Sequence, residues 1–174
     1  MNLYLRMLLL WIRTRRARPL SLWDEGRVSF RVLPNDLDVL RHMNNGRYLT
    51  LLDLGRTDLM MRSGFWQKVQ ERGWYSVVAA QTITYKRSLT LWQKFDITTR
   101  VLGHDGRSVY MQQEFRRGAT LIARATIQAR FLRTEGGTVP LDDLFALAGG
   151  EPEHLELPGW VEEWASAVRI TSQE

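Results

Sequence analysis

The chemistry of this 174-residue chain is concentrated in one polar segment, residues 35–48, which holds two aspartates, one histidine and three asparagines. Buried polar groups cost free energy unless they are hydrogen-bonded, so a polar segment between apolar runs needs a structural or functional reason. The apolar run that follows predicts a helix over residues 45–62, and a helix N-terminus offers unpaired backbone N–H groups with a partial positive charge. Such an end can stabilise the oxyanion that forms when a carbonyl group is attacked. An upstream carboxylate can attack that carbonyl or deprotonate water.

Hydrophobic periodicity predicts the elements that position this segment. Residues 28–32 alternate as a short half-buried strand, which Pro34 ends. Asn44 is placed to cap the helix over residues 45–62, and a Ser-Gly pair follows its last residue. That helix is apolar on nearly all sides, so we expect it to be largely buried.

After Gly73 the pattern changes to the period of two that is typical of strands. Four such stretches comprise residues 77–85, 95–101, 109–115 and 121–131. One helix cannot supply the crossovers of a parallel sheet, so we expect a largely antiparallel sheet wrapped around the helix. The predicted class is therefore α+β, with five strands around a long central helix. Further short helices are expected after Pro140 and Pro158.

The polar segment resembles a known signature. Residues 36–48 read Asp-x-Asp-x-x-x-His-Met-Asn-Asn-x-x-Tyr, which resembles the 4-hydroxybenzoyl-CoA thioesterase-like branch of the hot-dog-fold superfamily. The stretch Tyr-Lys-Arg-Ser-Leu at residues 85–89 and the alanine-rich last strand resemble the same branch. The combination is most similar to small bacterial acyl-CoA thioesterases and to thioesterase superfamily member 6-like proteins. The resemblance covers residues 25–145.

The resemblance implies a hot-dog fold and hydrolysis of an acyl-CoA or acyl-carrier-protein thioester without a cofactor. By position, Asp38 matches the acid that this family uses as nucleophile or general base, and the backbone N–H of Asn45 matches the oxyanion donor. Plant acyl-carrier-protein thioesterases carry an asparagine where this chain has Leu40, which disfavours an Asn–His pair and favours Asp38. The residues expected to bind substrate or shape its loop are His42, Asn44, Tyr48, Tyr85, Lys86 and Arg87.

Several of these residues have a purely structural alternative. Asp36 and Asp38 can each form an Asx-turn, and His42 can tie the loop to the backbone. Asp53 and Arg56 are three residues apart on the predicted helix, a spacing that favours an ion pair. Asp53 lies roughly 12 Å along the helix axis from the first helical residue, so we do not expect it to serve as a second acid within one subunit.

Composition excludes several kinds of site. The chain has no cysteine, which excludes disulfides, thiolate metal sites and a cysteine nucleophile. The three histidines lack metal-ligand spacing, so we expect no metal. The seven tryptophans are interpreted as packing residues, and residues 85–87 can equally be strand positions with a solvated face. There is no glycine-rich phosphate loop and no Gly-x-Ser-x-Gly motif.

The net charge of +5 combines three unlike parts. Residues 1–18 hold five arginines and no acid, and residues 19–134 also carry an excess of Lys and Arg. Residues 135–174 hold nine acids against one arginine. A positive body suits a polyanion such as coenzyme A, and charge alone does not distinguish this from nucleic acid.

The N-terminal arm joins an apolar run to an arginine cluster. The run is shorter than the roughly 20 apolar residues of a spanning helix, and its charges follow it, unlike those of a secretory signal. Two interpretations stay open. The arm is a helix whose apolar side packs on the domain or on a second subunit, or it is a peripheral membrane anchor with Trp11 and the arginines at an anionic surface. Both imply a cytoplasmic location.

The expected organisation is an arm over residues 1–19, a hot-dog thioesterase domain over residues 20–149 and an acidic helical extension over residues 150–174. The resemblance implies a homodimer or homotetramer with the site at an interface. The main functional alternative is a non-catalytic module that binds acyl thioesters or lipids. A dehydratase would pair a histidine with an acid, which is disfavoured because His42 and Asp38 share one loop. Nucleic-acid binding is not expected.

Overall fold

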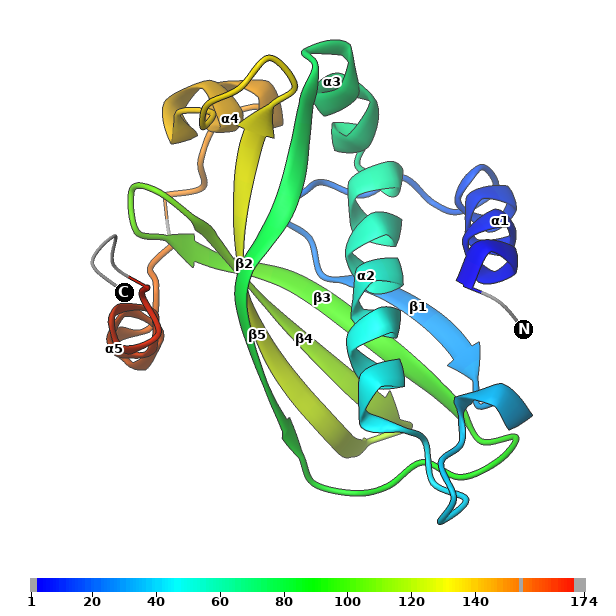
Figure 1. Cartoon of the computed structure of the whole chain (residues 1–174). Coiled ribbons are helices and arrows are strands. Elements are labelled where there is room, and N and C mark those ends of the chain that lie inside the picture. The colour runs from blue at the N-terminus through cyan, green and yellow to red at the C-terminus, as the bar shows by residue number, and fades with distance from the viewer. Residues whose placement is uncertain (1–2, 154, 171–174) are drawn as a thin grey trace.

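A five-stranded antiparallel sheet curves around one long helix (Figure 1). The computed structural model describes residues 3–153 and 155–170. The strands are β1 (Gly26–Arg31), β2 (Trp74–Tyr85), β3 (Lys94–His104), β4 (Val109–Arg117) and β5 (Thr120–Arg133). They lie in the order β1-β3-β4-β5-β2, and every neighbouring pair is antiparallel. This confirms the predicted α+β hot-dog arrangement.

The central helix α2 (Asn45–Arg62) begins and ends where the sequence predicts. The side chain of Asn44 accepts a hydrogen bond from the backbone N–H of Gly46 at 2.8 Å, so Asn44 is the N-cap. The helix approaches the sheet closely at Gly55, where an added Cβ would lie 2.8 Å from both Ile97 Cγ2 and Gln113 Nε2. Glycine therefore allows α2 to lie against the centre of the sheet.

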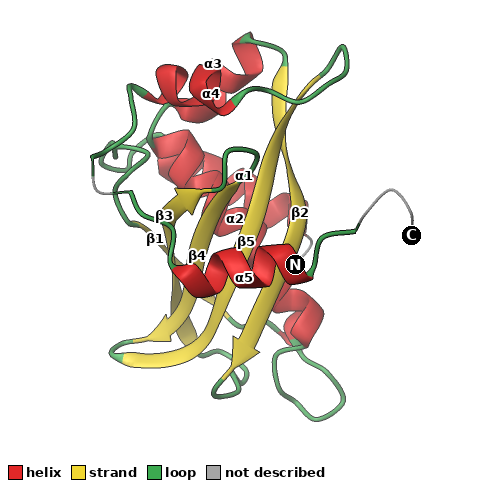
Figure 2. Cartoon of the chain, turned by 90° about the vertical axis from the view of Figure 1, so that its left-hand side faces the viewer, coloured by secondary structure: helices red, strands yellow, loops and turns green. Residues whose placement is uncertain are grey.

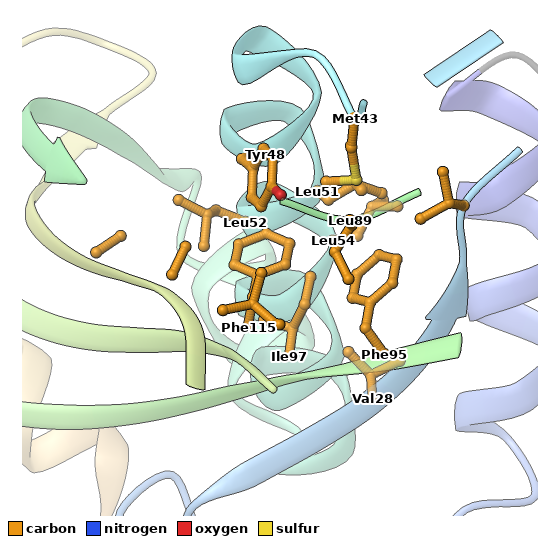
Figure 3. Close-up of a cluster of buried hydrophobic side chains, with 14 of the residues drawn as sticks. Val28, Met43, Tyr48, Leu51, Leu52, Leu54, Leu89, Phe95, Ile97 and Phe115 are labelled. Carbon is orange, nitrogen blue, oxygen red and sulfur yellow. The ribbon is translucent and has the colours of Figure 1, made fainter. Parts of the chain in front are cut away.

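The main core fills the space between α2 and the concave face of the sheet (Figure 3). Its large members are almost fully buried, and Tyr48, Phe95 and Phe115 form a chain of ring contacts through Phe115. Burial of this apolar surface is the main force that holds the helix in the sheet. The core residues labelled in Figure 3 are Val28, Met43, Tyr48, Leu51, Leu52, Leu54, Leu89, Phe95, Ile97 and Phe115.

Three short helices complete the body. Helix α3 (Phe65–Glu71) was not predicted; it follows Gly64, whose φ of 69° lets the chain turn and start a new helix immediately after α2. Helix α4 (Leu141–Ala148) follows Pro140 as predicted. Helix α5 (Gly159–Ala167) lies across the outer face of the sheet, opposite α2, and buries Val161 and Ala165 there (Figure 2).

The N-terminal arm forms helix α1 (Leu3–Thr14), which lies beside α2 and β1 (Figure 1). Only Arg6 and Leu10 are buried, while most of its large apolar side chains are exposed. The interpretation that the arm packs on its own domain therefore holds for Leu3, Met7 and Leu10, which contact the main core, but not for the larger exposed part of its apolar surface. None of the helices in the described part of the chain has the length and hydropathy that crossing a bilayer requires.

Candidate active site

The loop between β1 and α2 folds back on itself as a compact unit. A single 3₁₀ turn, η1 (Pro34–Asp36), starts it, and the backbone N–H of Asn44 donates to the carbonyl of Asp36 at 2.8 Å. Leu37 and Met43 form an antiparallel bridge. The loop therefore closes directly in front of α2, and both lie at the same end of the sheet (Figure 1).

The carboxylate of Asp38 is half-buried and is held by this loop. Its Oδ1 accepts the backbone N–H of Leu40 at 2.9 Å and that of His42 at 3.1 Å. The backbone N–H of Asp38 donates to the carbonyl of His42 at 2.8 Å, and Arg41 takes a left-handed conformation (φ 61°) at the tip of the turn. The Asx-turn interpretation of Asp38 is thus confirmed. Within residues 3–153 and 155–170, however, no hydrogen bond engages its second oxygen, Oδ2.

The start of α2 supplies the second predicted group. The side chain of Asn44 satisfies the N–H of Gly46, but the N–H of Asn45 has no acceptor among the described residues. The hydroxyl of Tyr85, at the end of β2, lies 3.5 Å from the carbonyl of Asn45. The first backbone N–H of α2 is therefore available to donate to a bound oxyanion, and it lies at the positive end of the helix dipole.

The other predicted substrate residues fall into two groups. His42 is exposed and its backbone forms a bridge with Thr90, and Lys86 and Arg87 are exposed beyond the end of β2. Tyr48, by contrast, is 1% exposed and packs edge-on against Tyr85, with ring centres 5.0 Å apart. Tyr48 therefore lies beneath the site and supports it from the core.

Burial determines the protonation of Tyr48. Desolvation raises the pKa of its hydroxyl to about 12, although a hydrogen bond with the backbone of Leu89 acts in the opposite direction. The phenol is therefore neutral near neutral pH. A neutral, buried phenol of this kind is not available as a base.

A buried ion pair that was not predicted anchors the loop. Arg6 of α1 and Asp36 are 6% and 2% exposed, and their nearest atoms are 2.5 Å apart. The same carboxylate oxygen accepts the backbone N–H of Leu33 at 2.9 Å. The Asx-turn interpretation of Asp36 is therefore wrong, because its side chain bonds backwards along the loop and across to α1. The available signal was the single arginine that interrupts the apolar run of the arm.

Asp53 lies two turns further along α2, away from the loop. It forms the predicted ion pair with Arg56, whose guanidinium also donates to Gln113 Oε1 at 2.7 Å. The buried amide of Gln113 in turn donates to the carbonyl of Leu52 and the hydroxyl of Thr99. Asp53 and Arg56 thus belong to a structural network between α2 and the sheet.

A groove of 490 Å³ opens on the outer face of the sheet beneath α5. Trp160 is 49% exposed at this groove, so the packing interpretation is wrong for this tryptophan. Arg124 is held there by Glu114 at 2.7 Å, while Tyr85 lines the groove and also contacts the start of α2. The lining residues are Thr82, Thr84, Tyr85, Lys86, Leu121, Arg124, Thr126, Trp160 and Trp164.

Comparison with known proteins identifies the family. The model of the thioesterase-like superfamily matches residues 32–165. Protein THEM6 of Xenopus laevis is 48% identical over 84 residues, which are 48% of this chain and 41% of that protein. Protein THEM6 of Drosophila melanogaster is 25% identical over 140 residues, which are 80% of this chain and 71% of that protein. The match thus spans well under two thirds of the frog protein.

Solved structures share the fold. The probable thioesterase YbaW of Escherichia coli superposes with a TM-score of 0.66 at 25% identity, over 70% of this chain and 95% of that one. The DHNA-CoA thioesterase of Staphylococcus aureus has a TM-score of 0.64 at 16% identity, over 84% of this chain and 97% of that one. With its sheet order, central helix and loop signature, the chain belongs to the thioesterase-like superfamily of hot-dog proteins.

Proposed function

We propose that this protein hydrolyses an acyl-CoA thioester to a free acid and coenzyme A, with Asp38 as nucleophile or general base. One observation carries the proposal. Among the described residues, the loop fixes one oxygen of the Asp38 carboxylate through two backbone N–H groups and leaves the other oxygen without a hydrogen bond. The helix that follows this loop starts with an N–H that has no acceptor in the same part of the chain. A pre-oriented carboxylate and a pre-oriented oxyanion donor are what acyl transfer requires.

Asp38 can act on the thioester in either of two ways. As a nucleophile, the carboxylate forms a bond to the carbonyl carbon, the C–S bond breaks, and the thiolate leaves and takes a proton from water. Water then hydrolyses the mixed anhydride and restores the carboxylate. As a general base, Asp38 takes a proton from the water that attacks the carbonyl; the C–S bond then breaks and the departing thiolate receives that proton, which restores the carboxylate. In either route the N–H of Asn45 stabilises the negative charge on the carbonyl oxygen.

The outer groove supports coenzyme A as the thiol. Exposed tryptophan rings stack on nucleobases, and cationic side chains bind phosphates. Trp160 provides an exposed ring and Trp164 a partly buried one, while Lys86 and Arg124 provide the charge. Tyr85 lines this groove, and its hydroxyl also lies 3.5 Å from the carbonyl of Asn45 at the start of α2. A single ligand that contacts Tyr85 can therefore reach both places. The S. aureus relative, whose name specifies a CoA thioester, is consistent with this choice.

The test compares Asp38→Ala and Asp38→Asn with the parent on a panel of acyl-CoAs, with thiol release as the readout. We expect both variants to lose about 100-fold or more in kcat, the size of a typical acid–base or nucleophilic contribution. Asp53→Asn is the matched control, because it removes a carboxylate of the same helix-and-loop unit that points to Arg56.

The possible outcomes separate the alternatives. Undiminished turnover by Asp38→Ala would refute the assignment of this residue. Stabilisation of the parent by acyl-CoA with no release of thiol would instead identify a binding module, because a ligand that binds only the folded state raises the melting temperature by mass action.

A further inference from the structure

Helix α1 packs one narrow apolar side, formed by Leu3, Met7 and Leu10, on the main core. It buries a charged residue, Arg6, and exposes most of its large apolar side chains. Exposed apolar residues are normal when scattered, but a contiguous patch on a soluble protein marks an interaction site. The outer face of α1, as we call this patch, comprises Tyr4, Leu5, Leu8, Leu9, Trp11 and Ile12, each between 41% and 80% exposed.

Polar anchors fix the orientation of this helix. The guanidinium of Arg6 donates to Asp36 and to the carbonyl of Arg31, and that of Arg13 donates to the carbonyl of Ser29 at 3.1 Å. Burying the outer face of α1 against the domain would require the helix to rotate about its axis, and that rotation would break the buried ion pair of Arg6 with Asp36. The exposed apolar face is therefore held outward by the structure.

Positive charge surrounds the outer face of α1. Residues 13–18 hold four arginines and no acid, and the guanidinium of Arg15 stacks 3.5 Å above the ring of Trp11. A groove of 430 Å³ between α1 and β1 is lined by four cationic side chains and five other residues, none of them acidic. The cationic residues of this groove are Arg6, Arg13, Arg31 and Lys94.

We propose that the outer face of α1 docks on a bilayer surface that contains anionic phospholipid. Apolar side chains on one side of a helix, with tryptophan and arginines at its border, suit the boundary between acyl chains and phosphate headgroups. At a rise of 1.5 Å per residue the helix is about 18 Å long, so it lies in the interface and does not cross it. Lys94 and Arg31 at the groove are placed to meet phosphates.

A second copy of the chain fits this surface less well. Residues 1–18 contain no carboxylate, so the same face of another copy would bring more arginines and no opposite charge. A lipid surface supplies both the apolar interior and the negative charge. The proposal does not depend on thioester hydrolysis, because it rests on α1, the arginines after it and the groove beside it.

The test is co-sedimentation of the full-length protein with vesicles. Phosphatidylcholine vesicles mixed with phosphatidylglycerol are compared with vesicles of phosphatidylcholine alone, at low and high salt. We expect binding to the anionic vesicles that is at least about tenfold tighter and weakens with salt. Two double variants, Leu5→Ser with Leu8→Ser and Arg15→Gln with Arg16→Gln, should each reduce this binding about tenfold.

Matched controls keep the result interpretable. Val168→Ser removes an exposed apolar side chain from the C-cap of α5 and should bind like the parent. The altered leucines are about half exposed, so both double variants should keep the melting temperature of the parent. Equal binding to neutral and anionic vesicles, no binding at all, or full binding by the variants would each overturn the proposal. A variant that turns an oligomer into a monomer, with vesicle binding absent in the parent, would show that the face joins two copies.

Discussion

Replacing Arg6 with methionine should destabilise the protein by about 3 kcal/mol or more. The ion pair is closed from solvent on both sides, and removal of one partner of a buried pair typically costs about 3–5 kcal/mol because a charge is left uncompensated. Arg47 lies 3.9 Å from Asp36 Oδ1 and the N–H of Leu33 still donates to Oδ2, so we expect the lower end of that range.

Urea unfolding followed by circular dichroism measures this difference. A loss of about 3 kcal/mol corresponds to a fall of roughly 6–12 °C in melting temperature for a chain of this size. Adding Asp36→Asn to Arg6→Met should recover part of the loss, because the double variant buries no charge. A double-mutant cycle should give a coupling energy above about 1 kcal/mol.

Arg13→Met is the matched control for the same helix. Its guanidinium makes one exposed hydrogen bond to the carbonyl of Ser29, so its removal should cost less than about 1 kcal/mol. Two results would show that the ion pair does not anchor the loop. One is a loss of unfolding free energy in Arg6→Met that is no larger than in Arg13→Met, and the other is no recovery of unfolding free energy when Asp36→Asn is added to Arg6→Met.

Three other substitutions probe the groove, the helix contact and the sheet. Trp160→Ala should raise the KM for an acyl-CoA about tenfold and leave kcat unchanged. The KM for the corresponding acyl-pantetheine, which lacks the nucleotide, should not change. An equal effect on both substrates would exclude stacking of Trp160 on the nucleotide. Gly55→Ala should destabilise by about 1–3 kcal/mol in urea unfolding, because overpacking outweighs the gain in helix propensity. Burial opposes ionisation of Glu114, but hydrogen bonds and charges of Arg116 and Arg124 lower its pKa below 4.5. Its stabilising effect is therefore present above the unfolded pKa and lost as the pH falls through the folded pKa. The free energy of unfolding of Glu114→Gln should thus depend less on pH than that of the parent as the pH falls below 4.5.

The architecture was predictable because its signals are local and repeated. The period of two in four stretches, the cap at Asn44 and the apolar character of residues 45–62 each reflect which side chains face the core. Helix α3 was missed because it has seven residues and follows α2 without a separating loop. A short segment of this kind carries too few turns for a periodic signal.

The candidate site was predictable only in part. The loop signature located Asp38 and the helix start, since both depend on residues close together in sequence. The partner of Asp36 lies 30 residues away in the arm, and no periodicity links an arginine to one particular carboxylate. The exposed outer face of α1 has the same origin, because a tertiary ion pair of Arg6 orients a helix whose apolar side chains lie on nearly all sides.

The network around Gln113 limits how this protein can be redesigned. Its amide has one acceptor, used by Arg56, and its donor group is shared between the carbonyl of Leu52 and the hydroxyl of Thr99. Sliding the helix by a single turn would separate Gln113 from both Arg56 and the carbonyl of Leu52, while its bond to Thr99 stays within the sheet. Buried polar groups would thus lose partners, so shifted positions of the helix are penalised. Sequence changes at this junction must therefore occur together, and a library that varies one of these positions alone should return few folded clones.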